Sequence, residues 1–310
     1  MRIVSLLPSS TEMVFALGLA DSLVGVTHEC DFPPEALSLP QVTRSAIPPG
    51  ASSLEIDKAV SSALDDQGSI YDLDQDLLES LAPDLILTQR LCDVCAVSFD
   101  RVQAAVSGLS SRPRVINLEP HGLNDIFENI LTVAEATGRE QAGRELVDSL
   151  RARVEGVRQR TVNLAARPRV FSMEWVNPPY CGGHWMKELV DLAGGRDALS
   201  NDQKPSYRVS WEKVVQFAPE IIVLTCCGFG LERNLKEGEW LAAFPGALNL
   251  PAFQSGRVYA TDGSSYFSRP GPRIVESLEI LAYLIHPELF PTPPLDHAFG
   301  ALRLTAVKPA

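Results

Sequence analysis

The sequence contains no long hydrophobic run. No stretch approaches the roughly 18 consecutive apolar residues that a membrane-spanning helix requires. The first residues, Met1 to Pro8, have too short an apolar core for a secretory signal, and no small-residue cleavage site follows them. The sequence therefore predicts a cytoplasmic protein without membrane insertion, or a periplasmic or surface-anchored protein if the start of the chain is misassigned.

Concentrated positive charge is also missing. The chain has 27 Lys and Arg against 39 Asp and Glu, which gives a formal net charge of -12, and its basic residues form no cluster. Nucleic acids and anionic membranes attract proteins through a concentrated positive field. Neither is therefore expected as a partner.

The common sequence signatures of catalysis are missing as well. There is no Gly-x-Gly-x-x-Gly after a predicted strand, no P-loop, no Gly-x-Ser-x-Gly elbow and no His-Glu-x-x-His motif. No nucleophile, base and orienting group are brought together by their spacing. These absences favour a binding protein over an enzyme.

The sequence does contain a regular alternation of buried strands and amphipathic helices. Such alternation is typical of a parallel sheet with crossover helices. The predicted strands form two sets, the first at 2–7, 22–27, 84–88 and 114–118, and the second at 169–173, 220–225 and 257–261. We therefore predict an α/β fold with two Rossmann-like lobes.

The two sets of strands share an internal repeat. Residues 77–88 match residues 213–224 in pattern, because each segment has an amphipathic helix, then Ala-Pro and an acidic residue, then a buried strand. Between the two sets, segment 138–163 carries apolar residues every three or four positions and no proline, which predicts one long helix. We expect an N-terminal lobe at 1–137, a connecting helix at 138–163 and a C-terminal lobe at 164–310.

The order of these features resembles a known family. The opening segment Arg2 to Glu12, the segment Leu23 to Val26, the Leu-Ala-Pro-Asp-Leu-Ile segment and the long central helix together resemble the class III substrate-binding proteins of ABC importers. Within that family, the vitamin B12-binding branch is the most similar. The resemblance implies a cleft between the lobes for a cobalamin, siderophore, haem or metal ion, and permease docking through Asp76 and Glu212.

All six cysteines follow predicted strands, and the resemblance implies that these strand ends meet at one cleft. A Cys-x-x-Cys spacing can give two thiolates to one metal, and thiolate with imidazole suits zinc, iron or an iron-sulfur cluster. We expect the thiols to converge there. The candidate ligands are Cys92 and Cys95, then Cys30 and Cys181, then Cys226 or Cys227, together with His28 and His184.

Two other interpretations of these cysteines stay open. Free cysteine is among the most buried residue types, so any one of them can be a packing residue. The pair Cys92 and Cys95 can also be a thioredoxin-like redox pair, although no strong helix start follows it except Ser98.

Aromatic residues occupy the same predicted loops, and planar macrocycles are bound mostly by apolar faces with a few polar contacts. Arg269 lies in a loop stiffened by Pro270 and Pro272, so it is a candidate for holding an anion. The aromatic candidates are Trp175, Tyr180, Trp185, Tyr207, Phe229, Tyr266 and Phe267.

The sequence thus leaves two functional hypotheses. The first is a non-enzymatic binding protein that holds a corrinoid, an iron chelate or a related metal complex between its lobes. The second is a cytosolic metalloprotein whose cleft cysteines hold zinc, iron or an iron-sulfur cluster for sensing, delivery or an unrecognised reaction.

Overall fold

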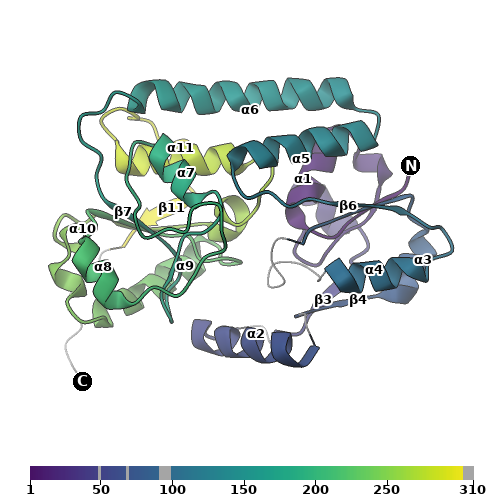
Figure 1. Ribbon diagram of the computed structural model, residues 1–310, viewed down its shortest axis with the longest axis horizontal. Coiled ribbons are helices and arrows are strands. Elements are labelled where there is room, and N and C mark those ends of the chain that lie inside the picture. The colour runs from purple at the N-terminus through teal and green to yellow at the C-terminus, as the bar shows by residue number, and fades with distance from the viewer. Residues whose placement is uncertain (48–49, 68–69, 91–98, 303–310) are drawn as a thin grey trace. The chain divides into compact units, whose positions relative to one another are not determined.

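A computed structural model describes residues 1–47, 50–67, 70–90 and 99–302 (Figure 1). The chain forms two compact units: unit 1 comprises Met1–Pro120 and Asn124–Asp148, and unit 2 comprises His121–Leu123 and Ser149–Ala310. The predicted long helix is present as α6 (Glu140–Thr161), and its residues are divided between the two units.

Unit 1 is built on a four-stranded sheet in which every neighbouring pair is parallel. The strand order is β2 (Leu23–Gly25), β1 (Ile3–Ser5), β5 (Leu85–Thr88) and β6 (Arg114–Asn117). Its helices are α1 (Pro8–Ala16), α3 (Gln75–Leu81), α4 (Phe99–Ser107) and α5 (Leu123–Ala136). The central strands β1 and β5 are buried along their whole length, as the continuous apolar runs of parallel strands require.

A second, two-stranded sheet in unit 1 was not predicted. Strands β3 (Thr43–Ser45) and β4 (Tyr71–Leu73) pair antiparallel, and helix α2 (Ser53–Gln67) lies between them in the chain. Tyr71 and its neighbour Ile70 pack into a core cluster with Val4 and Ile86 of the main sheet.

Unit 2 is built on a mixed five-stranded sheet. Strands β7 (Val170–Trp175), β9 (Ile221–Leu224) and β10 (Val258–Thr261) are parallel to one another. The short strands β8 (Tyr180–Cys181) and β11 (Phe299–Ala301) pair antiparallel at the two edges. The helices are α7 (Met186–Leu192), α8 (Trp211–Phe217), α9 (Leu231–Gly238), α10 (Pro251–Gln254) and α11 (Ile274–Ile285).

Helices α7 and α11 pack on each other, on the side of the unit 2 sheet that also carries the end of α6 (Figure 1). Arg153 of α6 donates two hydrogen bonds, of 2.9 and 2.6 Å, to the carboxylate of Glu279 on α11. A bidentate pair of this kind fixes the angle between two helices as well as their separation. It attaches the second half of α6 to unit 2.

The internal repeat has a structural counterpart that we call the Arg–acid clamp. In unit 1, Asp84 accepts a hydrogen bond of 2.7 Å from the backbone N–H of Arg2, and the Arg2 side chain donates to the carbonyl at the end of α3. In unit 2, Glu220 accepts one of 2.9 Å from the backbone N–H of Arg169, whose side chain donates to the carbonyl just after α8. The clamp explains why an acidic residue follows Ala-Pro in both segments.

Candidate functional site

The parallel strands of unit 2 end at one edge of the sheet, and the segments that follow them lie against one another. The N–H of Ser264, which follows β10, donates a 3.0 Å hydrogen bond to the carbonyl of Phe229, which follows β9. A Cβ at Gly263 would collide with the Cys226 carbonyl, so only glycine allows the two segments to approach this closely. Open α/β sheets bind ligands at such carboxyl edges.

A row of three aromatic side chains flanked by two arginines lies at this edge. Trp175 ends β7 and pairs across the strands with Tyr180 of β8. Its ring lies 4.9 Å from the ring of Phe229, measured between centroids. Arg208 lies over the Tyr180 ring at 5.8 Å and Arg233 lies over the Phe229 ring at 4.5 Å. We call these five residues the aromatic row.

The aromatic row combines apolar faces with a positive charge at each end. Cation–π contacts of this kind hold a guanidinium flat against a ring. Arg208 also donates to the Tyr180 hydroxyl at 3.1 Å, and Arg233 to the Glu237 carboxylate at 2.9 Å. Trp175 and Tyr180 are partly exposed, so their rings can receive a flat ligand.

Three of the other four aromatic residues predicted at the site are buried, and Tyr207 is exposed. Trp185 donates its indole N–H to the carbonyl of Phe267 at 3.1 Å, and both side chains are buried. Tyr266 is buried under Arg273, whose guanidinium lies 5.2 Å from the ring centroid. Tyr207 is exposed, but its hydroxyl donates to the Leu199 carbonyl at 3.0 Å. These residues form the framework behind the row.

The predicted anion-binding arginine is also part of this framework. Arg269 is 95% buried, and its guanidinium donates to the Ser264 hydroxyl at 3.4 Å. Ser264 belongs to the helical turn Gly263–Phe267. Arg269 therefore braces the segment that follows β10.

Two carboxylates are enclosed next to the row. Glu174, the neighbour of Trp175, accepts a 2.8 Å hydrogen bond from the N–H of Gly183, and burial raises its pKa to about 7. Asp197 accepts hydrogen bonds from the N–H groups of Ser172, Leu199 and Ser200, and burial raises its pKa as well. Both carboxylates hold loops in place.

The cysteines of unit 2 do not have the properties of metal ligands. Burial raises the pKa of the Cys181 thiol to about 11 and that of Cys226 well above the ordinary value. Metal ligation requires the thiolate, which these surroundings disfavour. Cys181 also lies within strand β8 rather than in a loop, and Cys227 is partly buried.

In unit 1, Cys30 and His28 are held by hydroxyl groups. The Cys30 sulfur lies 3.1 Å from the hydroxyl of Thr11 and 3.2 Å from that of Thr27. His28 Nδ1 shares a 2.8 Å hydrogen bond with Thr43. These contacts fix the loop after β2.

The predicted convergence of thiols on one metal is not supported. Among residues 1–47, 50–67, 70–90 and 99–302, no three His, Cys, Asp or Glu side chains are grouped so that they could hold a metal ion. Cys92 and Cys95 lie outside the described residues. Nothing in the described chain indicates iron-sulfur or zinc binding by thiols, because Cys30 is held by hydroxyl groups and burial disfavours the thiolates of Cys181 and Cys226.

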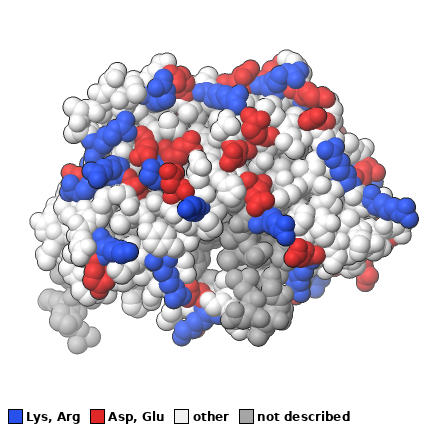
Figure 2. Space-filling model, viewed as in Figure 1, with Lys and Arg blue, Asp and Glu red and all other residues white. Residues whose placement is uncertain are grey.

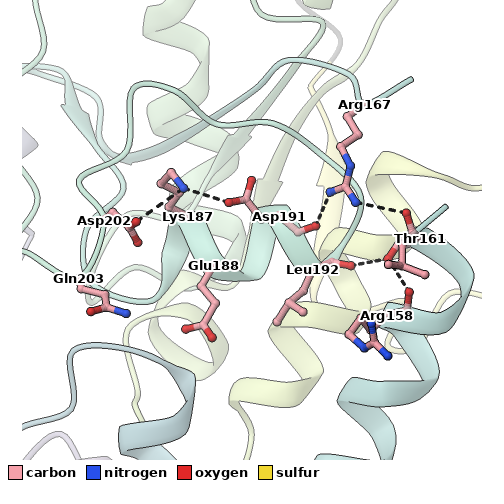
Figure 3. A pocket seen from close by; sticks show the side chains of 10 residues that line it. Arg158, Thr161, Arg167, Lys187, Glu188, Asp191, Leu192, Asp202 and Gln203 are labelled. Atoms are coloured by element: carbon pink, nitrogen blue, oxygen red, sulfur yellow. Dashed lines mark hydrogen bonds and ion pairs between the residues drawn. The ribbon is translucent and has the colours of Figure 1, made fainter. Parts of the chain in front are cut away.

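Unit 2 also has a surface pocket of about 450 Å³ beside the end of α6 and α7 (Figure 3). Its charged groups are engaged with one another. Lys187 lies 3.0 Å from Asp191 and 3.7 Å from Asp202, and Arg167 donates to the carbonyls of Asp191 and Thr161. None of the described residues that line this pocket is aromatic, so the row remains the stronger candidate for binding a flat ligand.

The two predicted docking carboxylates occupy equivalent, exposed positions. Asp76 lies in the first turn of α3 and Glu212 in the first turn of α8. Acidic and basic side chains are intermixed over the face shown in Figure 2. In the described part of the chain, no helix has the length and apolar character needed to cross a membrane.

Sequence reasoning missed the two arginines of the row. Arg233 lies four residues after Phe229, in the first turn of α9, and Arg208 follows the candidate Tyr207 directly. Arginine beside an aromatic residue in a predicted ligand loop was the available signal. The cross-strand contact that brings Arg208 to Tyr180 depends on β8, which was not predicted.

Comparison with known proteins identifies a family and several relatives that match most of the chain. A family described as periplasmic binding protein matches residues 3–264. A protein of Bacillus subtilis, named an uncharacterised ABC transporter substrate-binding lipoprotein, is 26% identical over 295 residues, which cover 93% of this chain and 81% of that protein. A vitamin B12-binding protein of Vibrio cholerae is 25% identical over 287 residues, which cover 91% of this chain and 88% of its own.

Solved structures share the fold. A periplasmic heme-binding protein of Pseudomonas aeruginosa aligns with a TM-score of 0.73 at 17% identity and covers 98% of this chain and 99% of its own. The resemblance to class III substrate-binding proteins, stated from sequence motifs, is confirmed by these matches.

Proposed function

The chain belongs to the periplasmic binding protein family, and on that premise we propose that it is the substrate-binding component of an ABC importer. Its ligand is a large, flat, metal-bearing ring compound of the corrinoid or haem class. The observation that carries this proposal is the aromatic row, where two arginines flank three rings at the carboxyl edge of the unit 2 sheet.

The chemistry of the row supports this ligand class. A conjugated macrocycle offers a wide apolar face, and Trp175 and Tyr180 offer partly exposed rings on which it can stack. Arg208 and Arg233 add positive charge at the ends of the row, which favours a ring with carboxylate substituents, as in haem. The relative from Vibrio cholerae is named for vitamin B12 and the structural neighbour from Pseudomonas aeruginosa for heme, both metal-bearing rings.

We further propose that the chain works outside the cytoplasm, in the periplasm or anchored at the cell surface. This corrects the expected cytoplasmic location, which has no support among relatives named as a lipoprotein or as periplasmic proteins. The alternative of a cytosolic metalloprotein is set aside for the same reason and because the described thiols form no metal site.

We also propose that Asp76 and Glu212 contact the permease. The two residues are separated by the same 136-residue offset as the repeated segments, so each unit presents one exposed carboxylate at the start of an equivalent helix. Exposed carboxylates at matched positions suit a partner that offers one basic side chain to each unit.

The proposed ligand class is tested by titrating the purified chain with cyanocobalamin and, separately, with hemin, following binding by calorimetry. We expect one of the two to bind, and Trp175→Ala to weaken that binding at least tenfold, because a stacked indole contributes about 1–3 kcal/mol to binding a flat ring. Trp240→Ala is the matched control, since Trp240 is 64% exposed and lies outside the row.

Two results would contradict the proposal. The first is a folded chain that binds neither compound. The second is a Trp175→Ala variant that binds its ligand as tightly as the parent and the Trp240→Ala variant do.

A further inference from the structure

Two histidine side chains of unit 2 lie together beside the aromatic row. The ring of His184 lies 6.2 Å from the ring of His121, measured between centroids, and 5.5 Å from the ring of Trp185, on which it is stacked. His121 is exposed and His184 is partly buried. No sequence pattern pairs them, because 62 residues separate them in the chain.

The backbone holds His184 in an unusual conformation. Its φ of +50° lies in the left-handed region, which residues other than glycine seldom adopt. Its N–H donates to the carbonyl of Lys204 at 2.6 Å, and its carbonyl accepts from the N–H of Gln203 at 3.1 Å. Residues held in this region against their preference are concentrated at functional sites.

The segment that carries His121 is fixed separately. The N–H of Leu123 donates a 2.8 Å hydrogen bond to the carboxylate of Glu188, which lies in the first turn of α7. A Cβ at Gly122 would lie 3.0 Å from the same carboxylate oxygen, so the chain passes close to α7 at this point. Glu188 therefore positions the segment that brings His121 to His184.

The environment of His184 suits a metal ligand. Its Nδ1 atom is shielded from solvent and has no hydrogen-bond partner. A neutral imidazole has a free lone pair for a transition metal, whereas a protonated one does not.

We infer that His121 and His184 together bind one divalent transition-metal ion, such as Zn²⁺, Ni²⁺ or Cu²⁺. With metal–nitrogen bonds of about 2.0–2.1 Å, two imidazoles that share one ion have ring centroids about 5.2 Å apart at the tetrahedral angle and about 6.4 Å apart when they lie opposite each other. The observed 6.2 Å is about 1 Å longer than the tetrahedral value, and rotation of the exposed His121 side chain can close that difference. No third His, Cys, Asp or Glu of the described residues completes a cluster, so water reaches the remaining positions from the exposed His121 side.

This site is independent of the proposed function. Neither histidine belongs to the aromatic row, and the ion is bound as a simple cation rather than as part of a ring compound. The metal test therefore uses the chain without corrinoid or haem, and its failure leaves the ligand proposal untouched.

The inference is tested with tag-free, full-length protein. Zn²⁺ binding is measured by calorimetry, and Cu²⁺ binding by electron paramagnetic resonance, which detects coordinated imidazole nitrogen. We expect His121→Gln and His184→Gln each to lower Zn²⁺ affinity at least tenfold and to remove one imidazole from the Cu²⁺ spectrum. His297→Gln is the matched control, because the His297 side chain is exposed in the same unit.

His121→Gln is the decisive variant, because an exposed side chain can be changed without affecting folding. The inference is overturned if this variant binds Zn²⁺ as tightly as the parent, as it would if thiols captured the ion. A Cu²⁺ spectrum without two imidazole nitrogens, or an equal loss of affinity in His297→Gln, also overturns it.

Discussion

At the scale of single residues, Glu174 connects two loops of unit 2 through one carboxylate. It accepts hydrogen bonds from the N–H of Gly183 and from Ser206, and it directly precedes Trp175 of the aromatic row. Its pKa of about 7 results mainly from burial, which disfavours the charged form. The protonation state of Glu174 therefore changes near neutral pH.

This pKa gives the chain a pH-dependent stability with a defined sign. An unfolded Glu titrates near 4.5 and the folded Glu174 near 7. Between these values the folded chain keeps a proton that the unfolded chain has lost, so stability falls as pH rises from about 4.5 to about 7 and then levels off. Glu174→Gln should remove this component and become more stable than the parent at pH 7.5, by up to about 3 kcal/mol.

Urea denaturation at pH 4.5, 5.5, 6.5 and 7.5 checks the prediction. Glu212→Gln removes one exposed carboxylate and serves as the control for the loss of a negative charge. If the parent and Glu174→Gln give parallel stability curves over this range, the carboxylate is ionised throughout and the assignment is wrong.

At the scale of secondary structure, helices α3 and α8 end in the same uncommon way. Ala82 after α3 and Ala218 after α8 both have left-handed backbones, with φ of 40° and 49°. This conformation is costly for any residue with a Cβ and nearly free for glycine, which is the preferred residue at a helix end of this type. Each Arg–acid clamp follows directly after such a turn.

Ala218→Gly should therefore stabilise the chain by about 0.5–1 kcal/mol, although glycine usually destabilises a fold through its freedom in the unfolded state. Ala193→Gly is the matched control. Ala193 ends α7 with a φ of -70° and is fully buried, so its replacement should destabilise. Thermal unfolding of the three proteins tests the ranking, which is refuted if both glycines lower the melting temperature alike.

The sequence predicted the elements whose patterns are long enough to read. The seven strands expected from apolar runs are present, and the helix expected at 138–163 is present as α6 (Glu140–Thr161). Strands β3, β4, β8 and β11 are two or three residues long, and Thr43–Ser45 has no alternation of apolar and polar residues. Such strands form because a neighbouring strand supplies their hydrogen bonds, which is a tertiary effect that no local pattern records.

The candidate site was only partly predictable for a related reason. Position at a strand end identified Trp175, Tyr180 and Phe229, which do meet in unit 2. The same rule placed Cys30 after β2 and Cys226 after β9, but it could not show that Cys30 is held by two hydroxyl groups or that Cys226 is enclosed. Side-chain direction and burial decide between a ligand and a packing residue.

At the scale of the whole molecule, the repeat presents one exposed carboxylate in each unit. We predict that Asp76→Lys/Glu212→Lys lowers the stimulation of a cognate permease's ATPase at least tenfold in proteoliposomes, because each reversal replaces an attraction with a repulsion. Ligand affinity should be unchanged, since both carboxylates are exposed and neither belongs to the aromatic row. The measurement compares stimulated ATPase rates at low and high salt.

The control for this prediction carries the same change in net charge on another surface. Glu145→Lys/Asp148→Lys places two lysines on the exposed side of α6. If this control loses stimulation as strongly as the docking variant does, the effect is one of overall charge, and the assignment of Asp76 and Glu212 fails.

The four tryptophans allow ligand binding to be followed by the intrinsic fluorescence of the protein. Trp185 and Trp211 donate their indole N–H groups to the carbonyls of Phe267 and Pro245, and Trp240 is surrounded mostly by water. Of the four, only Trp175 belongs to the row. A light-absorbing ring stacked on Trp175 would therefore quench the fluorescence of Trp175 most strongly. The red-shifted emission of the exposed Trp240 would remain as an internal reference. Occupancy can thus be read from the emission colour of the unlabelled protein.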